Sequence, residues 1–323
     1  MLSLNAPNAA HIDAARRRIF GTAVRTPQLR LDVDLPFELW LKLESLQPIG
    51  SFKLRGAINA LRALPPDRLS RGVYTASAGN MAQGVAWGAR ELGVACTVLV
   101  PDRAPQTKLD AIVRLGATII KLPYERWWQV LVDHGYEGMT AEFIHPVSNQ
   151  DVLAGNATVG AEIIEDAPGP VAAVFVPYGG GGLSAGIAAS MIDISASTSV
   201  FGCEVETAAP FNASRTAKKP VTIEHTPSFI DGIGGRSVLE EMWPLTSTLL
   251  VDSLVVSVAQ VADAVRLLIS RGRVVAEGAG ATGVAAAIAH GPHRVEPGSL
   301  CVAVVSGGNI DLDVLRRIIA KEI

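Results

Sequence analysis

Short β-branched runs alternate with helical patterns along almost the whole of this chain of 323 residues. The runs at 72–77, 95–101 and 117–123 are each followed by an amphipathic stretch, and a second series of the same kind starts at residue 171. Neighbouring parallel strands need a crossover connection, which a helix supplies, so this pattern predicts βαβ units and parallel sheets. Two series of such units predict two α/β lobes.

Composition and charge argue against two other classes of protein. The formal net charge is only -3 and the basic clusters are short, so we expect no nucleic-acid partner. Residues 167–192 carry no charge, as a membrane helix would, but three prolines and four consecutive glycines interrupt them. We therefore predict a strand, a loop and a helix there, and no membrane partner.

The cysteines point to a reducing compartment. Cys96, Cys203 and Cys301 stand singly inside apolar runs, without the spacing of a metal site or a disulfide framework. The first twenty residues lack the charged start and apolar core of a secretory signal. These features predict buried thiols and a cytoplasmic location.

Three loops stand where predicted strands end and helices begin. They are Ser77–Asn80, Gly179–Gly182 and Ser306–Asn309. In open parallel sheets ligands bind beyond the carboxyl ends of the strands, so we expect one site to collect all three loops.

The four glycines at 179–182 have more than one interpretation. Glycine leaves backbone N–H groups uncovered, and the following helix adds its positive end, so a phosphate is the natural ligand. A tight turn filled with small residues is the simpler alternative. Gly180, Gly182 and Ala185 also fit a dinucleotide fingerprint, with Glu204 about 20 residues further on, which would indicate a nicotinamide-dependent dehydrogenase.

Lys53 gains its interest only from its combination with these loops. Most lysines are solvated charges. The turn at Ser77–Asn80 could bind a carboxylate through its amides or could simply contain a helix cap, and Ser306 could face a ligand or sit in a flexible turn. A lysine together with a phosphate loop, a carboxylate loop and a hydroxyl is what pyridoxal 5'-phosphate (PLP) requires.

At this point the chain resembles the threonine dehydratase and serine racemase group of fold type II PLP enzymes. The likeness runs from about Arg25 to the C-terminus. It rests on eight ordered segments: "SLQPIGSFKLRGA", "TASAGNMAQGVA", "FIHPVSNQDVLAGNATVGAEI", "VPYGGGGLSAGIA", "CEVE", "FIDGIGG", "VVAEGAGA" and "VVSGGNIDLD".

The resemblance implies a two-lobed α/β fold like that of the tryptophan synthase β chain, with a largely parallel twisted sheet in each lobe. Residues 1–45 and 146–323 would form a large PLP-binding domain, and residues 46–145 a small mobile domain. The group also implies a homodimer or higher homo-oligomer and a small amino-acid substrate.

The resemblance also implies roles for individual residues. Lys53 would bind PLP as a Schiff base, Phe52 would lie against the ring, Asn80 would approach its 3-oxygen and Ser306 would face its nitrogen. The phosphate would be bound by Gly179, Gly180, Gly181, Gly182 and Leu183, and the substrate carboxylate by Ser77, Ala78, Gly79 and Asn80.

The implied activity converts L-threonine, L-serine or a related 3-hydroxy amino acid to a 2-oxo acid and ammonia, with Lys53 removing the α-proton. Racemisation and β-replacement are the alternatives within the fold. Racemases of the group carry a serine as a second base where this chain has Ala78, so we expect weak racemisation. A dehydrogenase or an inactive binding protein are the alternatives outside it.

Three further positions bear on this interpretation. Met81 replaces the group's histidine, which suggests altered substrate positioning. Glu204 and the Ala208 carbonyl match two ligands of the group's cation site, but Pro210 replaces the aspartate, so Mg²⁺ or another cation would need a water as third ligand. Trp127 and Trp128 are expected in a helix core, with a substrate pocket or a subunit contact as alternatives.

Overall fold

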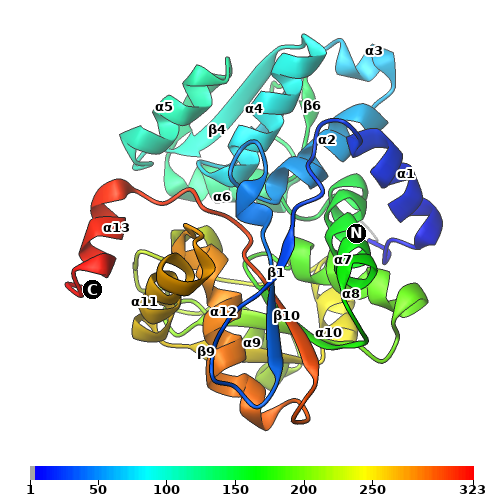
Figure 1. Ribbon diagram of the computed structural model, residues 1–323. Helices are drawn as coiled ribbons and strands as arrows, with labels where there is room; N and C mark the ends of the chain where they lie inside the picture. Colours follow the sequence, from blue (N-terminus) through cyan, green and yellow to red (C-terminus); the bar gives the residue numbers. More distant parts are fainter. Residues whose placement is uncertain (1–3) are drawn as a thin grey trace.

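The computed structural model describes residues 4–323 and contains two separate sheets. The larger sheet has the strand order β1-β2-β10-β7-β8-β9, in which only β1 runs antiparallel to its neighbour (Figure 1). Its strands are β1 (Gln28–Arg30), β2 (Glu38–Lys42), β7 (Val171–Pro177), β8 (Ser199–Val205), β9 (Asp252–Val256) and β10 (Leu300–Val304). We call the part built on this sheet the larger lobe.

The second sheet has the order β5-β4-β3-β6 and is parallel throughout. Its strands are β3 (Val73–Ala76), β4 (Cys96–Pro101), β5 (Thr118–Leu122) and β6 (Glu142–Phe143). The helices of this smaller lobe are α3 (Pro66–Leu69), α4 (Asn80–Leu92), α5 (Gln106–Arg114) and α6 (Tyr124–Val132). All four strands thus lie between residues 73 and 143.

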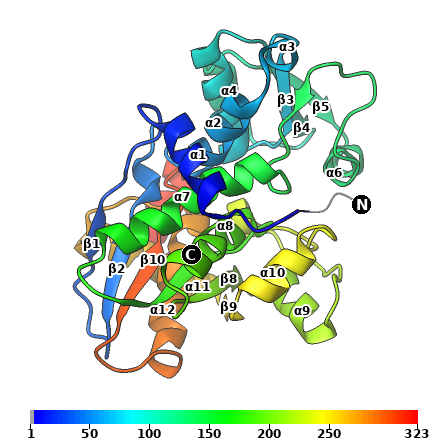
Figure 2. The same cartoon turned by 90° about the vertical axis from the view of Figure 1, so that its right-hand side faces the viewer.

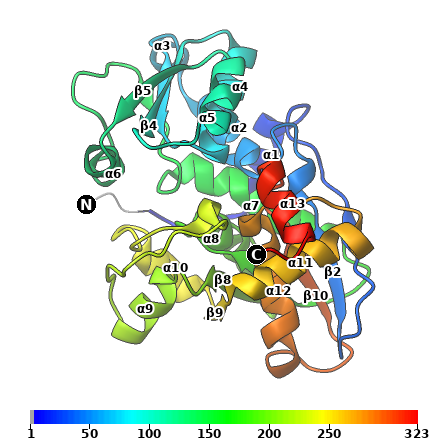
Figure 3. The same ribbon diagram turned by 90° about the vertical axis from the view of Figure 1, so that its left-hand side faces the viewer.

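The remaining helices surround the larger sheet or join it to the smaller lobe. They are α1 (Ala9–Ile19), α2 (Lys53–Ala63), α7 (Gln150–Asp166), α8 (Gly182–Ile194), α9 (Pro210–Ala217), α10 (Trp243–Leu249), α11 (Val258–Leu267), α12 (Gly278–His290) and α13 (Leu312–Ile319). Helix α7 packs on α8 and on α2, and α2 packs on α4, so α7 lies between the lobes (Figure 2). Helix α13 lies beside α11 (Figure 3).

Both faces of the larger sheet are buried, as expected for parallel strands. Along β7, Ala173 and Phe175 belong to the core shared with α11 and α12, whereas Val174 and Val176 belong to the core shared with α7 and α8. The α/β class with largely parallel sheets is therefore confirmed. The exact boundaries of the two domains, and the mobility of the smaller one, stay predictions.

Several smaller predictions can be compared with this fold. The uncharged stretch forms β7, a glycine turn and α8, and no helix among residues 4–323 is long and apolar enough to cross a membrane. All three cysteines are free and buried, and burial raises the pKa of the Cys96 and Cys301 thiols to about 12. Trp127 and Trp128 lie on α6 and pack, partly buried, against the smaller-lobe core.

A buried ion cluster joins α2 to the larger lobe. The Arg55 guanidinium donates to both oxygens of Glu44 at 2.8 Å and to those of Glu162 on α7 at 2.7 and 2.8 Å. The Arg55 and Glu44 side chains are completely buried. Burial alone would raise the pKa of Glu44, but the charge and hydrogen bonds of Arg55 hold this pKa below its ordinary value. The charges therefore satisfy one another inside the protein.

Removing Arg55 should be strongly destabilising, because Glu44 and Glu162 would lose their partner while still buried. We expect Arg55→Ala to lower the free energy of unfolding by about 3–5 kcal/mol in a urea titration. Arg316→Ala, which removes an exposed ion pair with Glu322, is the control and should change little. Equal midpoints for the two variants would contradict this role of the cluster.

Candidate active site

Main-chain contacts place Lys53 at the first position of α2, against the loop that follows β10. The Phe52 N–H donates to the Ser306 carbonyl at 3.0 Å, and Ser51 forms an antiparallel bridge with Gly307. Two of the segments identified in the sequence are thus joined directly. Ser306 is itself buried, with 4% of its surface exposed.

The Lys53 amine lies in the cleft without an acidic partner. Its Nζ donates to the Pro146 carbonyl at 2.8 Å and lies 5.2 Å from the centre of the Phe52 ring. Among residues 4–323, no carboxylate forms an ion pair with it, and burial lowers the pKa of this amine to about 8. Since a nucleophile or base needs the neutral amine, Lys53 suits both tasks near neutral pH.

The glycine turn between β7 and α8 forms a narrow cradle next to Lys53. Gly181 has φ +87°, and no side chain caps the start of α8, so its first N–H groups remain free for an anion. A Cβ on Gly180 would lie 2.5 Å from Cγ2 of Val147. Val147 directly follows Pro146, whose carbonyl accepts from Lys53, so one short segment contacts both the lysine and the glycine turn.

The turn at the start of α4 completes the cleft. The Ser77 hydroxyl accepts from the Gly79 N–H at 3.2 Å, and Gly79 itself occupies the N-cap position without a side-chain cap. Asn80 opens the helix, and its Oδ1 accepts from Nδ2 of Asn309 at 2.8 Å. The loops at 77–80 and 306–309 therefore meet, and both lie close to the start of α2.

Comparisons with known proteins agree with this geometry. Residues 19–307 match the family model described as pyridoxal-phosphate dependent enzyme. The chain belongs to this PLP-dependent family. Its cofactor is therefore PLP, and the fold is that of the fold type II members.

Named relatives refine the comparison. The chain is 36% identical to an L-threonine ammonia-lyase of Thermotoga maritima, over 88% of this chain and 70% of that protein. It is also 36% identical to the chloroplastic biosynthetic threonine dehydratase of Arabidopsis thaliana, over 93% of this chain but only 51% of the relative. It thus spans about half the length of that plant protein.

Solved structures give the same picture. Maize serine racemase superimposes with a TM-score of 0.90 at 30% identity, covering 98% of both chains. A bacterial threonine deaminase, from T.th., superimposes with a TM-score of 0.87 at 34% identity, covering 95% of this chain and 99% of that one. Dehydratases and racemases therefore share this architecture.

The residues of the cleft fit PLP. The free N–H groups at the start of α8 suit its phosphate, and the low-pKa amine of Lys53 suits covalent attachment to its aldehyde. Leu183 follows on α8 and is buried, and Phe52 is partly buried beside the lysine. The individual roles of these residues toward the cofactor stay predictions.

Two residues behave differently from what the sequence suggested. Met81 is 1% exposed in the smaller-lobe core, so it does not border the cleft and cannot contact a substrate there. Ala78 packs its methyl group, partly buried, against that same core. The expectation that Met81 alters substrate positioning by direct contact is therefore wrong.

Glu204 is committed to structural hydrogen bonds. Its carboxylate accepts from the N–H groups of Phe211 and Asn212 at 2.9 and 2.7 Å and from the Ser253 hydroxyl at 2.6 Å. It caps the start of α9, which Pro210 opens, and burial raises its pKa to about 7. With its side chain buried in these contacts, Glu204 is not available to a dinucleotide ribose. The cation predicted at Glu204 and Ala208 stays untested, and no cation is needed to explain the carboxylate.

The sequence analysis assigned no role to two segments that shape the cleft. In the first, His145 accepts at Nδ1 from the N–H groups of Val147 and Ser148, at 3.0 and 2.8 Å, and so holds the turn that contacts Lys53. Burial lowers its pKa to about 3, so the ring is neutral. The second segment contains Glu277, whose Oε1 accepts from Nδ2 of Asn80 at 2.8 Å. Both segments belong to the quoted motifs, but only the fold reveals their partners.

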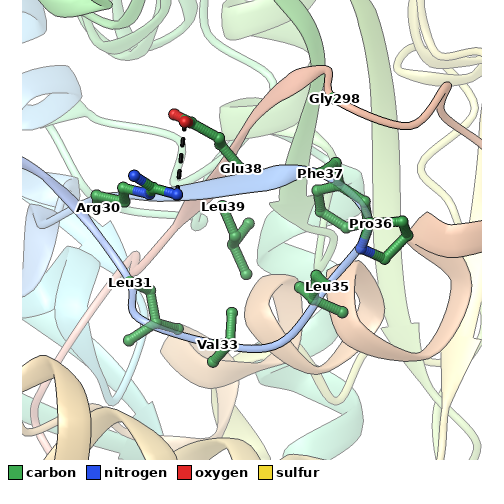
Figure 4. Close-up of a pocket in the computed structure, with 9 residues that line it drawn as sticks. All are labelled: Arg30, Leu31, Val33, Leu35, Pro36, Phe37, Glu38, Leu39 and Gly298. Atoms are coloured by element: carbon green, nitrogen blue, oxygen red, sulfur yellow. Dashed lines mark ion pairs between the residues drawn. The ribbon is translucent and has the colours of Figure 1, made fainter.

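A separate hollow lies far from this chemistry. The loop between β1 and β2 encloses a cavity of about 220 Å³ at the edge of the larger sheet, lined mainly by aliphatic side chains (Figure 4). Arg30 and Glu38 form an ion pair of 3.5 Å at its rim. It shares no residue with the cleft around Lys53.

The pKa of Lys53 can be tested by adding PLP to the cofactor-free protein at a series of pH values. Because burial lowers this pKa, the neutral amine should accumulate up to about pH 8, and the rate of covalent PLP uptake should rise with pH and level off there. An ordinary lysine would still be less than about 1% neutral at pH 8. Uptake is followed by visible absorbance, with Lys53→Ala as the control that binds no PLP covalently. A rate that continues to rise steeply above pH 9 would contradict the shift.

The glycine cradle can be tested by adding a single methyl group. In Gly180→Ala the new Cβ would press against Val147, so we expect the affinity for PLP to fall by roughly tenfold or more. Gly169→Ala is the matched control, because nothing lies within 4 Å of its Cβ. PLP affinities from fluorescence titration should differ between the two variants, and identical values would show that the turn does not hold the cofactor closely.

Proposed function

We propose that this protein is a PLP-dependent dehydratase that converts L-threonine, L-serine or a related 3-hydroxy amino acid to a 2-oxo acid and ammonia. The observation that carries the proposal is the Lys53 amine, which has a low pKa and no acidic partner and lies between the phosphate cradle and the turn at 77–80. Relatives named as threonine ammonia-lyase or dehydratase, at about a third identity, support the substrate class.

Each part of the cleft has a task in this reaction. The PLP ring, when bound, supplies the electron sink that makes the α-proton of the substrate acidic. Lys53 Nζ takes that proton as general base, since its neutral form is accessible near neutral pH. The uncapped N–H groups at the start of α4 hold the substrate carboxylate, and the two lobes exclude water from the reacting atoms.

Racemisation is the second candidate, because solved serine racemases share the fold. A racemase must return a proton from the opposite face of the substrate, which needs a second group that carries one. Ala78 carries none, so we propose that elimination dominates. The dehydrogenase alternative has no support left, because the chain belongs to a PLP family and Glu204 caps a helix.

The proposal is tested with a panel of L-threonine, L-serine, L-allo-threonine and 3-hydroxyaspartate, scored for 2-oxo acid and ammonia, with Mg²⁺ or a chelator. We expect turnover of at least one substrate, and little formation of D-serine in a chiral assay. Ala78→Ser should raise D-serine formation relative to elimination, and Ala82→Ser, buried one turn further along α4, is the control that should not. Fast interconversion of D- and L-serine by the unchanged protein would overturn the proposal.

We also propose a cytoplasmic location and a homodimer or higher homo-oligomer. The buried reduced thiols support the first, although one relative is named as chloroplastic. Exposed apolar side chains such as Phe20 and Leu312, 85% and 80% exposed, are consistent with a subunit contact. The oligomeric state is measured by light scattering on the purified protein.

A further inference from the structure

Glu277 stands at the N-cap position of α12, yet its side chain does not cap that helix. It is instead directed toward the loop after β10 and the start of α4. Its Oε1 accepts from Asn80 Nδ2 at 2.8 Å, and its own N–H donates to the Gly307 carbonyl at 3.1 Å. A side chain at 307 would collide with this oxygen, so the glycine leaves room for the carboxylate. No cation among residues 4–323 forms an ion pair with Glu277.

We propose that Glu277 is a positioning residue that fixes the orientation of the Asn80 amide toward the PLP ring. The proposal rests on PLP as the cofactor and on the predicted role of Asn80 beside the 3-oxygen. It does not depend on which amino acid is the substrate.

The hydrogen-bond chain around Asn80 allows only one orientation of its amide. Asn309 Nδ2 donates to the Ile49 carbonyl at 2.8 Å, and a carbonyl can only accept, so this end of Asn309 is the donor. The same Nδ2 donates to Asn80 Oδ1 at 2.8 Å. At the other end of the Asn80 amide, the Glu277 carboxylate accepts from Nδ2. Reversing the amide would therefore place oxygen against oxygen and nitrogen against nitrogen.

This orientation leaves a defined group for the cofactor. Asn80 Nδ2 carries two hydrogens, and Glu277 is its single acceptor among residues 4–323. The second N–H is free to donate, and a negatively charged ring oxygen needs such a donor. Without the Glu277 acceptor, the amide would lose one of its two restraints, and its carbonyl oxygen could turn toward the ring oxygen and repel it.

The contact also joins the two lobes. Asn80 opens α4 of the smaller lobe, whereas Glu277 and Asn309 follow α11 and β10 of the larger lobe. Burial raises the pKa of Glu277 to about 7, with Asp231 raising it further and Lys108 lowering it. Both charged groups lie across the same cleft and form an ion pair with each other. A carboxyl that gains a proton becomes a weaker acceptor for Asn80, so the restraint weakens below neutral pH.

The test uses the visible absorption spectrum of the PLP-loaded protein, which reports the charge on the 3-oxygen independently of turnover. Glu277→Ala should reduce the long-wavelength band and weaken PLP binding by roughly tenfold, the effect of one lost hydrogen bond to a charged group. Glu277→Gln keeps an acceptor, so it should retain most of the band but lose its dependence on pH near 7. Glu296→Gln, at an exposed glutamate of the same lobe, is the control and should match the unchanged protein.

A double-variant cycle distinguishes positioning from a general structural effect. If Glu277 acts through Asn80, the variant Asn80→Ala should show the same spectral change, and combining it with Glu277→Ala should add little. Asn309→Ala removes the other restraint and should shift the spectrum in the same direction, which keeps the test available if Glu277→Ala fails to fold. Additive effects, or a Glu277→Ala spectrum and PLP affinity equal to those of the unchanged protein, would overturn the proposal. Loss of dehydratase activity with these spectral effects intact would refute only the proposed function.

Discussion

The ion cluster around Arg55 is the constraint on which the geometry of the cleft depends. Arg55 lies two residues after Lys53 on α2, and its planar guanidinium is held by Glu44 after β2 and Glu162 on α7. Apolar side chains in its place could give equal stability, but they would allow the helix to rotate or slide. Bidentate contacts on two sides fix the direction of the guanidinium, and therefore the direction in which the first residue of α2 points.

The contacts across the cleft differ in kind from those that hold each lobe together. Each lobe has its own apolar core, whereas the lobes face each other through polar pairs, including Lys108 with Asp231 at 2.5 Å and His134 with Glu241 at 2.9 Å. Polar contacts exchange readily with water, so they cost little to open compared with an apolar core. This arrangement is consistent with the predicted mobility of the smaller lobe, while α2 and α7 hold the lysine in place.

Local patterns in the sequence were enough to predict the sheets, the glycine turn and the helix that follows Phe52, because each depends on neighbours within a few residues. The partners of the side chains in the cleft were not predictable in this way. Asn80 and Glu277 are 197 positions apart, and Lys53 and Pro146 are 93 apart. Met81 shows the same limit, since its position in a motif suggested a contact with substrate, while the packing of α4 on β3 and β4 buries it. A glutamate at a strand end, such as Glu204, likewise reads as a ligand until the helix that it caps is known.

The placement of acids in the cleft explains how one lysine can serve as both attachment point and base. A carboxylate beside Nζ would stabilise the ammonium form and raise the pKa of Lys53, which would remove the neutral amine at physiological pH. The nearby acid, Glu277, instead faces Asn80, and Lys53 Nζ has only the Pro146 carbonyl as a hydrogen-bond partner among residues 4–323. Burial without a counter-charge then lowers the pKa of the amine to about 8. The cleft thus keeps an acid for orienting a neutral amide while leaving its amine free to exchange a proton.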